Sequence, residues 1–597
     1  MGLALLSSCA LSNMVKKAKE QKLTVVPSPL ELHGDSVQFT MSAELPTKLL
    51  KKGKTYTLYT TYNYLDQKLQ LPDVIFDDKL FPNQKTESPK LSKKFSFAYK
   101  SESMNRGSLT LKGGAANLNG KTKFTPEMES AKGLILTSRL VQPSFFVAYA
   151  DHGYNKEPEY EPTTLDFNFD QGSSKLKISK QKVKATKGKK AKEVYTGTAA
   201  VLDAYIAAKN PTKTVTIVGM HSPEGREVKN VFLAEDRAKT IEAFYKKVLA
   251  DNGYKSLADS IQFVPRSLIQ VWGPFKDTLA VLPDLTADEK QAVLEIIDGP
   301  GTFIEQEAKI EELPFFPKLF VAMYHKLRLA KTEILTLKPK KADAEIEVLA
   351  RKIVEGTEPN TSLKDNELLY AASLSPIPAE KEGIFLAATK QNDSWIAHNN
   401  LGAVRLDMAI KTSDKASKAA LVDKAVANLE IAKAKQAAPE IFNNLGMAYL
   451  MKGDDAKALE AFRSGLASSP RDFLARMINA GKGQIEIRSA TYPDAVTSLT
   501  TATDNVVVDF NKGLAQLLNK DFNASLASFE EALAADSKFA LASYCAAIAA
   551  ARLNREADVA AYLKKAVASD SGLKAKALED LEFINFSEKP SFKDALR

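Results

Sequence analysis

Few residues of this chain could support metal or nucleophile chemistry. Only two cysteines are present, Cys9 and Cys545, too few for a cysteine-based zinc site or a disulfide framework. Five histidines lie scattered, and none forms the His-x-x-x-His pair that puts two imidazoles on one helix face (His33, His152, His221, His325 and His398). Cys545 lies among small residues with no histidine near it in sequence. We therefore expect a packed thiol there, no metal centre and no cofactor.

The pair His221-Ser222 comes nearest to a nucleophile beside its base. A nucleophile elbow needs glycine two residues before and two residues after the serine, because the chain turns sharply there. Met220 and Glu224 occupy those positions. Adjacent strand residues also point to opposite faces, so His221 cannot easily face Ser222. With no acid–base pair, metal cluster or nucleophile setting, the sequence predicts a protein that is not an enzyme.

Positive charge is concentrated in one short segment. The formal net charge is +9, and the segment from Lys175 to Lys192 holds nine lysines and no acidic residue (175, 177, 180, 182, 184, 187, 189, 190 and 192). No aromatic side chain interrupts the run, so it lacks the stacking platforms of single-stranded nucleic-acid binders. We expect a solvated loop, with a polyanion or an anionic lipid surface as the alternative, and no nucleic-acid partner.

Length and composition indicate an ordinary multidomain protein. The 597 residues are 44% hydrophobic and 26% charged, which is a globular balance. The chain is too long for one core and fits three or four domains. No apolar run is long enough for a transmembrane helix.

The first residues resemble a targeting segment. Leu6-Ser7-Ser8-Cys9 has the apolar residue, the two small residues and the cysteine of a bacterial lipoprotein signal box. The resemblance implies lipidation of Cys9: a diacylglycerol on its sulfur and, after cleavage, a third acyl chain on its amine, which together give stable anchoring. No basic segment precedes the box, so we expect Met1 to lie within a longer signal peptide. Residues 1–22 are predicted to be this signal remnant and a polar tether.

Residues 23–150 are predicted to form an immunoglobulin-like β-sandwich. Short runs of alternating apolar and polar residues are separated by polar turns that contain glycine or proline. The runs lie at 37–41, 56–62, 95–99, 109–111, 134–136 and 145–149. We expect this domain to dock or to act as a spacer.

Residues 163–275 resemble the OmpA-like peptidoglycan-binding domain. A strand, a helix at 199–208, a buried strand at 215–219 and a second helix follow the order of that family, and its motif residues fall at the family's offsets (Gly219, Gly225, Asn230, Leu233, Arg237 and Ala238). The resemblance implies an α/β fold of βαβαβ order. It also implies that Arg237 and an acidic residue hold the carboxylate and the ammonium of diaminopimelate.

One position departs from the pattern of the family, because Ser222 stands where the family has aspartate. A neutral hydroxyl loses a charge-assisted hydrogen bond, worth roughly 1.5–3 kcal/mol. Glu224, two residues on, could supply the carboxylate from a shifted geometry. The candidate peptidoglycan-binding residues are therefore Ser222, Glu224, Asn230 and Arg237. The alternative is a domain that keeps the fold without a wall ligand.

Residues 276–365 are predicted to be a mixed α/β connector. Thr286-x-x-Glu289 is a capping box, so a helix should run to Asp298, where Gly299-Pro300-Gly301 stops it. A strand is expected between 327 and 337, and a helix over 342–354. The strand could complete the sheet of the second domain or pair with the first domain.

Residues 366–585 are similar to tetratricopeptide repeats. The repeat-defining residues fall at the family's spacing (Leu445, Gly446, Tyr449, Ala458, Phe462, Pro470, Gly513 and Phe529). Gly446 and Ala458 should let paired helices approach, and Phe462 should fill the next repeat. We expect about five repeats in a superhelix whose concave face binds proteins, followed by a tail at 586–597.

The predicted fold is thus multidomain: an N-terminal β-sandwich, a central α/β OmpA-like domain and a C-terminal all-α tetratricopeptide superhelix. This order resembles accessory lipoproteins of Bacteroidota, including those near the type IX secretion and gliding machinery. It implies a non-enzymatic scaffold lipoprotein on the periplasmic side of the outer membrane, with the lipid bilayer, peptidoglycan and other envelope proteins as partners. The alternative is a protein-binding module of a surface or fimbria-like assembly whose OmpA-like domain no longer binds peptidoglycan.

Overall fold

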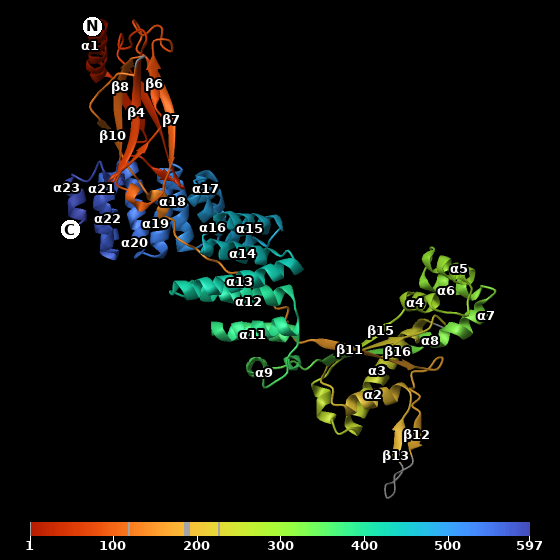
Figure 1. The fold of residues 1–597 in the computed structure, drawn as a ribbon. Helices are drawn as coiled ribbons and strands as arrows, with labels where there is room; N and C mark the ends of the chain where they lie inside the picture. The colour runs from red at the N-terminus through yellow and green to blue at the C-terminus, as the bar shows by residue number, and fades with distance from the viewer. Residues whose placement is uncertain (1, 118–119, 184–191, 225–226, 271) are drawn as a thin grey trace. The chain divides into compact units, whose positions relative to one another are not determined.

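The computed structural model describes residues 2–117, 120–183, 192–224, 227–270 and 272–597. The chain forms two compact units: unit 1 is Met1–Tyr154 together with Asp343–Arg597, and unit 2 is Asn155–Ala342 (Figure 1). The predicted connector at 276–365 is therefore not a domain of its own. Its first part belongs to unit 2 and its last helix to unit 1, because each part buries its apolar residues in a different core.

The N-terminal part of unit 1 is a sandwich of two antiparallel sheets. One sheet has the order β1-β3-β2, with β7 on the other edge of β3, and the second has the order β10-β8-β4-β5, with β6 on β4 and β9 on β8. The first sheet contains β1 (Lys22–Val26), β2 (Leu32–His33), β3 (Ser36–Glu44) and β7 (Lys90–Ala98). The second contains β4 (Lys54–Tyr64), β5 (Gln67–Gln70), β6 (Val74–Asp77), β8 (Ser108–Asn117), β9 (Thr122–Phe124) and β10 (Met128–Lys132).

Alternation of burial along the strands explains why these residues form a sandwich. In β3, Val37, Phe39 and Met41 are buried while the residues between them face outward, the period of two expected for a sheet with one covered face. Helix α1 (Gly2–Lys17) adds Leu11 and Met14 to the same core. The predicted tether is thus only partly right, since the lysine-rich segment ends α1 and then enters β1.

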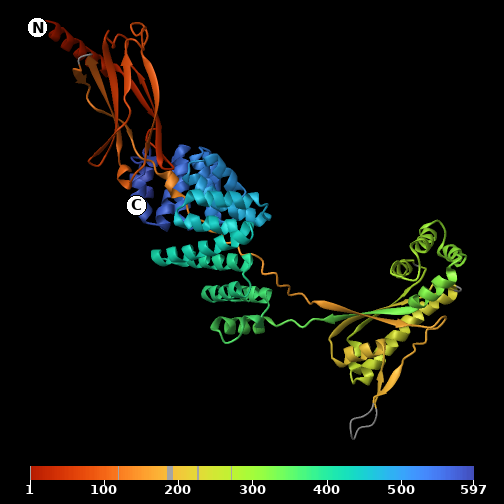
Figure 2. The same cartoon turned by 45° about the vertical axis from the view of Figure 1, so that its right-hand side comes forward.

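Two of the predicted strands are absent from the sandwich. Residues 134–136 form an isolated bridge, in which Ile135 pairs with Glu31, and no strand. Residues 145–149 are extended but pair with no strand in the described structure; they run along the helices of the array (Figure 2). Their alternating pattern is that of any extended chain, because side chains alternate whatever group bonds the backbone.

Unit 2 has a four-stranded mixed sheet of order β11-β16-β14-β15. Its strands are β11 (Tyr160–Asn168), β14 (Thr212–Met220), β15 (Gln262–Leu268) and β16 (Leu329–Leu337). β14 and β15 are parallel, and β16 is antiparallel to both β11 and β14. The strand expected between 327 and 337 therefore lies inside the sheet of the second domain, which decides the alternative that the sequence left open.

Helices α2 (Thr198–Ala207) and α3 (Glu227–Asp251) share the core of this sheet, and β12 (Lys180–Val183) pairs with β13 (Lys192–Tyr195) as a two-stranded ribbon. Most of the lysine run lies on this ribbon or outside the described residues. Between β15 and β16 the chain inserts helices with their own core, including α4 (Gly273–Ala280), α5 (Ala287–Asp298), α6 (Phe303–Glu311), α7 (Phe316–Leu319) and α8 (His325–Leu327). The capping box of Thr286 and Glu289 begins α5 as predicted.

The C-terminal part of unit 1 is a stack of helix pairs. After α9 (Asp343–Glu355), the pairs are α10 (Asp365–Leu374) with α11 (Pro378–Gln391), α12 (Trp395–Lys411) with α13 (Lys415–Lys435), α14 (Pro439–Lys452) with α15 (Asp455–Ala467), α16 (Asp472–Arg488) with α17 (Tyr492–Thr500), α18 (Val506–Leu518) with α19 (Phe522–Ala535), and α20 (Ala540–Arg552) with α21 (Glu556–Ser569). The expected tail is part of this stack, because α22 (Gly572–Glu579) and α23 (Pro590–Ala595) follow and Phe592 is buried.

Glycines set the close approach of paired helices. A Cβ on Gly446 would lie 2.4 Å from the Phe462 ring, and one on Gly481 would lie 2.5 Å from the same ring. Phe462 therefore fills the space between its own pair and the next. Gly513 stands in the same relation to Phe529, with 2.8 Å to the ring. These positions tolerate no larger residue without a shift of the helices.

The sandwich rests on the C-terminal end of the array through charged groups. Arg552 of α20 donates to Glu31 at 2.8 Å and to Glu582 at 2.6 Å, and Glu582 accepts from the Thr137 hydroxyl at 2.5 Å. His33 and the Tyr492 hydroxyl are 2.8 Å apart. The sandwich and the array are thus parts of one packed unit (Figure 1).

Candidate functional sites

The chain segment between the sandwich and unit 2 lies across the array as an extended strap, residues 141–151. Its backbone is bonded to amide side chains of the helices. The N–H of Gln142 donates to Asn511 Oδ1 at 2.9 Å, and Asn511 Nδ2 donates back to the Gln142 carbonyl at 2.8 Å. Each such side chain clamps both backbone groups of one strap residue.

Three more clamps follow along the strap. Gln484 clamps Ser144, with bonds of 3.0 and 2.8 Å. Asn444 clamps Ala148 with bonds of 2.8 and 2.7 Å, and Asn400 clamps Ala150 with bonds of 2.7 and 3.0 Å. We call these four side chains and their neighbours the amide ladder (Asn399, Asn400, Asn443, Asn444, Gln484 and Asn511).

The amide ladder lies on one face of the array because its members come from α12, α14, α16 and α18, the first helices of successive pairs. Asn399, Asn443, Asn444 and Asn511 are fully buried. Side-chain bonds orient them: Asn444 Nδ2 donates to Asn399 Oδ1 at 3.0 Å, and Asn399 Nδ2 donates to Asn400 Oδ1 at 3.0 Å. A carboxamide carries a donor and an acceptor at the spacing of a peptide group, so the ladder binds backbone groups of the strap and not its side chains.

The sequence predicts that the array presents a surface that binds other proteins, and in the structure the face that carries the ladder holds the protein's own strap. Sequence reasoning missed the ladder, although a signal was present: Asn-Asn-Leu-Gly occurs at 399–402 and again at 443–446. Two consecutive amides inside an apolar helix are costly unless each finds a partner.

In unit 2, Arg237 lies in α3 and is only 2% exposed. Its Nε donates to the Ser173 carbonyl at 3.0 Å, its Nη1 to the Met220 carbonyl at 2.6 Å and its Nη2 to the Asp170 carbonyl at 3.3 Å. Burial, with Arg328 nearby, lowers the pKa of Arg237 to about 10. The guanidinium stays charged at neutral pH and ties together the chain after β11 and the end of β14.

Glu224 has a cationic partner inside the protein. Arg328, which precedes β16, donates through Nε to Oε1 at 2.5 Å and through Nη2 to Oε2 at 2.8 Å. The Ser222 hydroxyl donates to the same carboxylate at 2.6 Å. The two charged side chains are only 11% and 13% exposed. Arg328 therefore occupies the role that the resemblance gave to the ammonium of diaminopimelate.

Of the predicted ligand residues, the structure brings Ser222, Glu224 and Arg237 together near the end of β14, with Arg328 as an unpredicted fourth member. The side chain of Asn230 and the backbone of Gly225 lie outside the described residues. The fork between Arg328 and Glu224 spans 104 positions in the chain, so no local pattern could reveal it.

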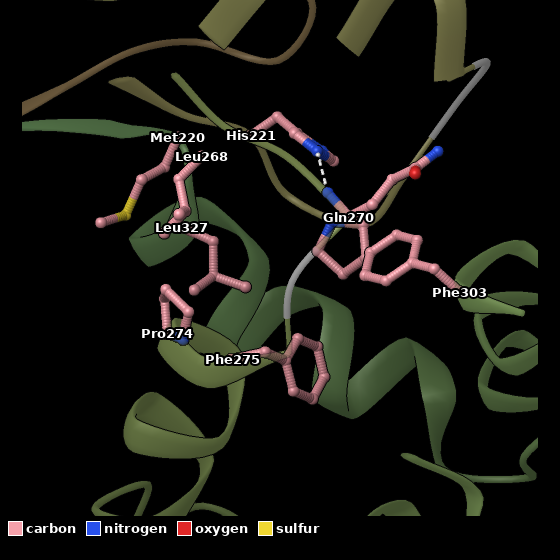
Figure 3. A pocket seen from close by; sticks show the side chains of 9 residues that line it. Met220, His221, Leu268, Gln270, Pro274, Phe275, Phe303 and Leu327 are labelled. Atoms are coloured by element: carbon pink, nitrogen blue, oxygen red, sulfur yellow. Dashed lines mark hydrogen bonds between the residues drawn. The ribbon is translucent and has the colours of Figure 1, made fainter. Parts of the chain in front are cut away.

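Beside this cluster is a small cavity of about 20 Å³ (Figure 3). His221 borders it and uses both ring nitrogens: Nδ1 contacts the Ser222 carbonyl at 2.9 Å, and Nε2 accepts from the Gln270 N–H at 3.3 Å. Phe275, Phe303 and other apolar side chains form the rest of the wall. The cavity has room for about one water molecule and none for a sugar or a peptide.

Cys545 is a packing residue in the structure. Cys545 is fully buried, and burial raises the pKa of its thiol, so it packs as a small apolar group. The side chain of Cys9 lies outside the described residues. In the ranges that the structure describes, no three His, Cys, Asp or Glu side chains gather as metal ligands would. Nor does any helix of those ranges have the length and apolar character to cross a membrane.

Comparison with known proteins gives likenesses of fold only. No protein-family model matches the chain, and no curated protein matches its sequence. The C-terminal part of a TPR repeat-containing protein from Cytophaga hutchinsonii is 17% identical, covers 39% of this chain and 91% of that chain, and has a TM-score of 0.29. A tetratricopeptide repeat protein from Parabacteroides merdae is 12% identical, with coverages of 42% and 98% and a TM-score of 0.27. The APC/C hetero-tetramer Cut9–Hcn1 is 14% identical, with coverages of 61% and 60% and a TM-score of 0.30.

The helix pairs themselves define the class. Pairs recur with a glycine or another small residue facing a large one, and Gly513 and Phe529 are followed 34 residues later by Ala547 and Leu563. The C-terminal region of this protein is therefore a stack of helix pairs of the tetratricopeptide kind. It is joined to a sheet-rich N-terminal region and to a separate α/β unit.

Proposed function

We propose that the protein is a non-enzymatic scaffold of the cell envelope that recruits other proteins through unit 1. The amide ladder carries this proposal. Four side chains clamp an extended backbone over four helix pairs, which is a surface suited to extended polypeptide and not to a reaction. The sandwich, docked at one end of the array, adds a second rigid surface.

Anchoring through Cys9 is part of the proposal. Leu11 and Met14 pack into the sandwich core, so acyl chains on Cys9 would hold the sandwich close to a bilayer. With the resemblance of the first residues to a lipoprotein signal box, we propose an outer-membrane lipoprotein on the periplasmic side, accessory to a secretion or gliding machinery. Incorporation of labelled palmitate into the wild type, and its loss in Cys9→Ala, is the expected result. Equal labelling of both proteins would remove the anchor from the proposal.

Peptidoglycan contact through unit 2 is the first candidate function of that unit, and one observation favours a second candidate. Glu224 is neutralised by Arg328, and Arg237 donates to three carbonyls. This supports the second candidate function, a protein-binding module of a surface assembly whose OmpA-like domain does not bind peptidoglycan.

Sedimentation with purified sacculi separates the two candidates. The full chain is mixed with sacculi, with and without free diaminopimelate as competitor. Wall contact predicts pelleting that the competitor and Glu224→Gln both reduce. The second candidate predicts no pelleting above that of sacculus-free protein. Lys331→Gln, an exposed change on neighbouring β16, is the matched control.

Recruitment of proteins is tested in cells. A photo-crosslinking residue placed at exposed positions of unit 1, such as Phe473 at 55% exposure, should give discrete heterologous adducts. The same residue at exposed positions of unit 2 supplies the comparison. A chain that gives no adduct at any unit 1 position would contradict the scaffold.

A further inference from the structure

The backbone of the strap is bonded on one edge only. Residues Gln142, Ser144, Phe146, Ala148 and Ala150 all bond to the array through a carbonyl, an N–H or both. The residues between them that carry an N–H are Phe145, Val147 and Tyr149, and their backbone groups have no hydrogen bond within the described part of the chain. Bonds at every second residue are the mark of a strand paired along one side.

The other side of the strap is therefore a strand edge without a backbone partner in the described part of the chain, half-buried at Phe145 and Val147. It carries the N–H and C=O groups of three alternate residues, and Tyr149 is 38% exposed. Pro143, the preceding residue of this edge, has no N–H and so limits pairing at that end. An unpaired edge of this kind is a template for an additional strand from another chain.

A cavity of about 240 Å³ lies beside the strap and adds side-chain chemistry. Phe145, Leu450 and Met451 give it an apolar wall, while Lys418 and Arg488 give it positive charge. Arg488 bonds Asp455 through Nη2, but its Nε is buried and has no hydrogen-bond partner among the described residues. Lys418 makes no ion pair in the same ranges. An unused buried donor and a nearby ammonium are suited to a carboxylate.

We propose that an extended segment of a partner protein adds as a β-strand to the free edge of the strap, residues 145–149, and places an acidic side chain beside Arg488 and Lys418. The strap is then part of the binding surface and not a plug that a partner must remove. This inference rests on the proposed scaffold function and names the chemistry of its partner.

Synthetic ten-residue peptides, used with the purified full chain, test this addition. The first peptide alternates valine and threonine around a central glutamate, and the second has lysine in place of that glutamate. The third is the glutamate peptide with its backbone amides N-methylated along both strand edges, so that neither edge can donate a hydrogen bond. The glutamate peptide should bind at least about tenfold more tightly than the other two. Equal binding of all three peptides, or no binding of the glutamate peptide at millimolar concentration, overturns the proposal.

Variants of the strap keep the test on this edge. Val147→Pro removes one edge N–H and no clamp, whereas Val147→Ala removes a similar side chain and keeps the N–H. We expect loss of peptide binding in the first variant and its retention in the second, with equal thermal unfolding of both as the folding control. Lys418→Glu should weaken the glutamate peptide, and Lys415→Glu, an exposed change on the same helix, should not.

Hydrogen exchange distinguishes addition from displacement. Addition protects the amides of Phe145, Val147 and Tyr149 when the peptide binds. Faster exchange at Ser144 and Ala148 would instead show that the peptide takes the place of the strap, which contradicts the proposal. If peptides fail while crosslinks in cells form elsewhere on unit 1, the scaffold stands and only the β-addition falls.

Discussion

The amide ladder of unit 1 and the charged cluster of unit 2 both place buried polar side chains against the backbone of a chain segment outside the strands. They satisfy the hydrogen-bonding groups of these side chains in different ways. The ladder uses neutral amides, four of which each bond the N–H and the carbonyl of one strap residue, whereas in the cluster Arg328 bonds Glu224 and Arg237 bonds nearby carbonyls. The comparison teaches that neutral clamps leave the far edge of their guest open, while the charged cluster closes on itself.

The largest effect should come from breaking the charged cluster. Arg328→Met removes the cation from the largely buried Glu224 carboxylate and leaves it neutral donors such as the Ser222 hydroxyl and Gln171 Nε2, so we expect a loss of about 4 kcal/mol in the stability of unit 2. Faster hydrogen exchange of β14 and β16 would report it. The double variant Arg328→Met with Glu224→Gln should recover most of the loss. A double variant as unstable as the single one would show that the pair is not the source.

The stability of unit 1 should depend on pH through Glu31, which lies where the sandwich contacts the array. Burial opposes the charge of Glu31, but bonds from His33 and Arg552 outweigh it and lower its pKa from 4.5 to about 2. The folded pKa lies below the unfolded one, so this stabilisation is present above about pH 4.5 and is lost as the pH falls from there towards 2.

Glu31→Gln should therefore cost about 2–3 kcal/mol at neutral pH and progressively less in acid. Unfolding of unit 1 by denaturant, measured for both proteins over that range, checks this. The ladder contains no titratable group, so the cost of a ladder substitution should not vary with pH over the same range. Parallel pH curves for Glu31→Gln and the wild type would refute the assignment.

Removal of one clamp should have a smaller effect. Asn444→Ala leaves the Ala148 N–H without its acceptor, while the Ala148 carbonyl keeps the bond from Asn399 Nδ2 at 3.2 Å. We expect a loss of about 2 kcal/mol and faster exchange of the Ala148 amide. Met447→Leu, a buried apolar change one turn along, is the control for general disturbance of α14. Unchanged exchange at Ala148 would mean that the clamp does not hold the strap.

The smallest expected effect separates side-chain from backbone recognition. The Tyr149 hydroxyl donates to Asp407 at 2.5 Å, at a partly exposed position. Tyr149→Phe should cost about 1 kcal/mol or less and leave all four clamps protected in hydrogen exchange. If it releases the strap, then side chains and not amides determine where the strap binds.

The sequence predicts the helices and strands better than it predicts which other segments they bond or pack against. The capping box of Thr286 and Glu289 gave the bounds of α5, because the signal is local. Residues 145–149 were predicted as a sandwich strand, since alternation reports an extended chain and not the group that bonds it. Gly446 and Phe462 were assigned their packing roles from repeat spacing, and the structure places them in contact. The fork of Arg328 with Glu224 could not be predicted, because it depends on β16 entering the sheet from a distant part of the chain.

One consequence concerns mechanical load. The strap begins at the sandwich, which is docked on the C-terminal helices, and runs back across the array to its N-terminal pairs, opposite to the order of the repeats. A pull between the sandwich and residue 154 is therefore directed along the strap. All four clamps resist such tension together in shear, whereas a pull across the strap would open them one after another.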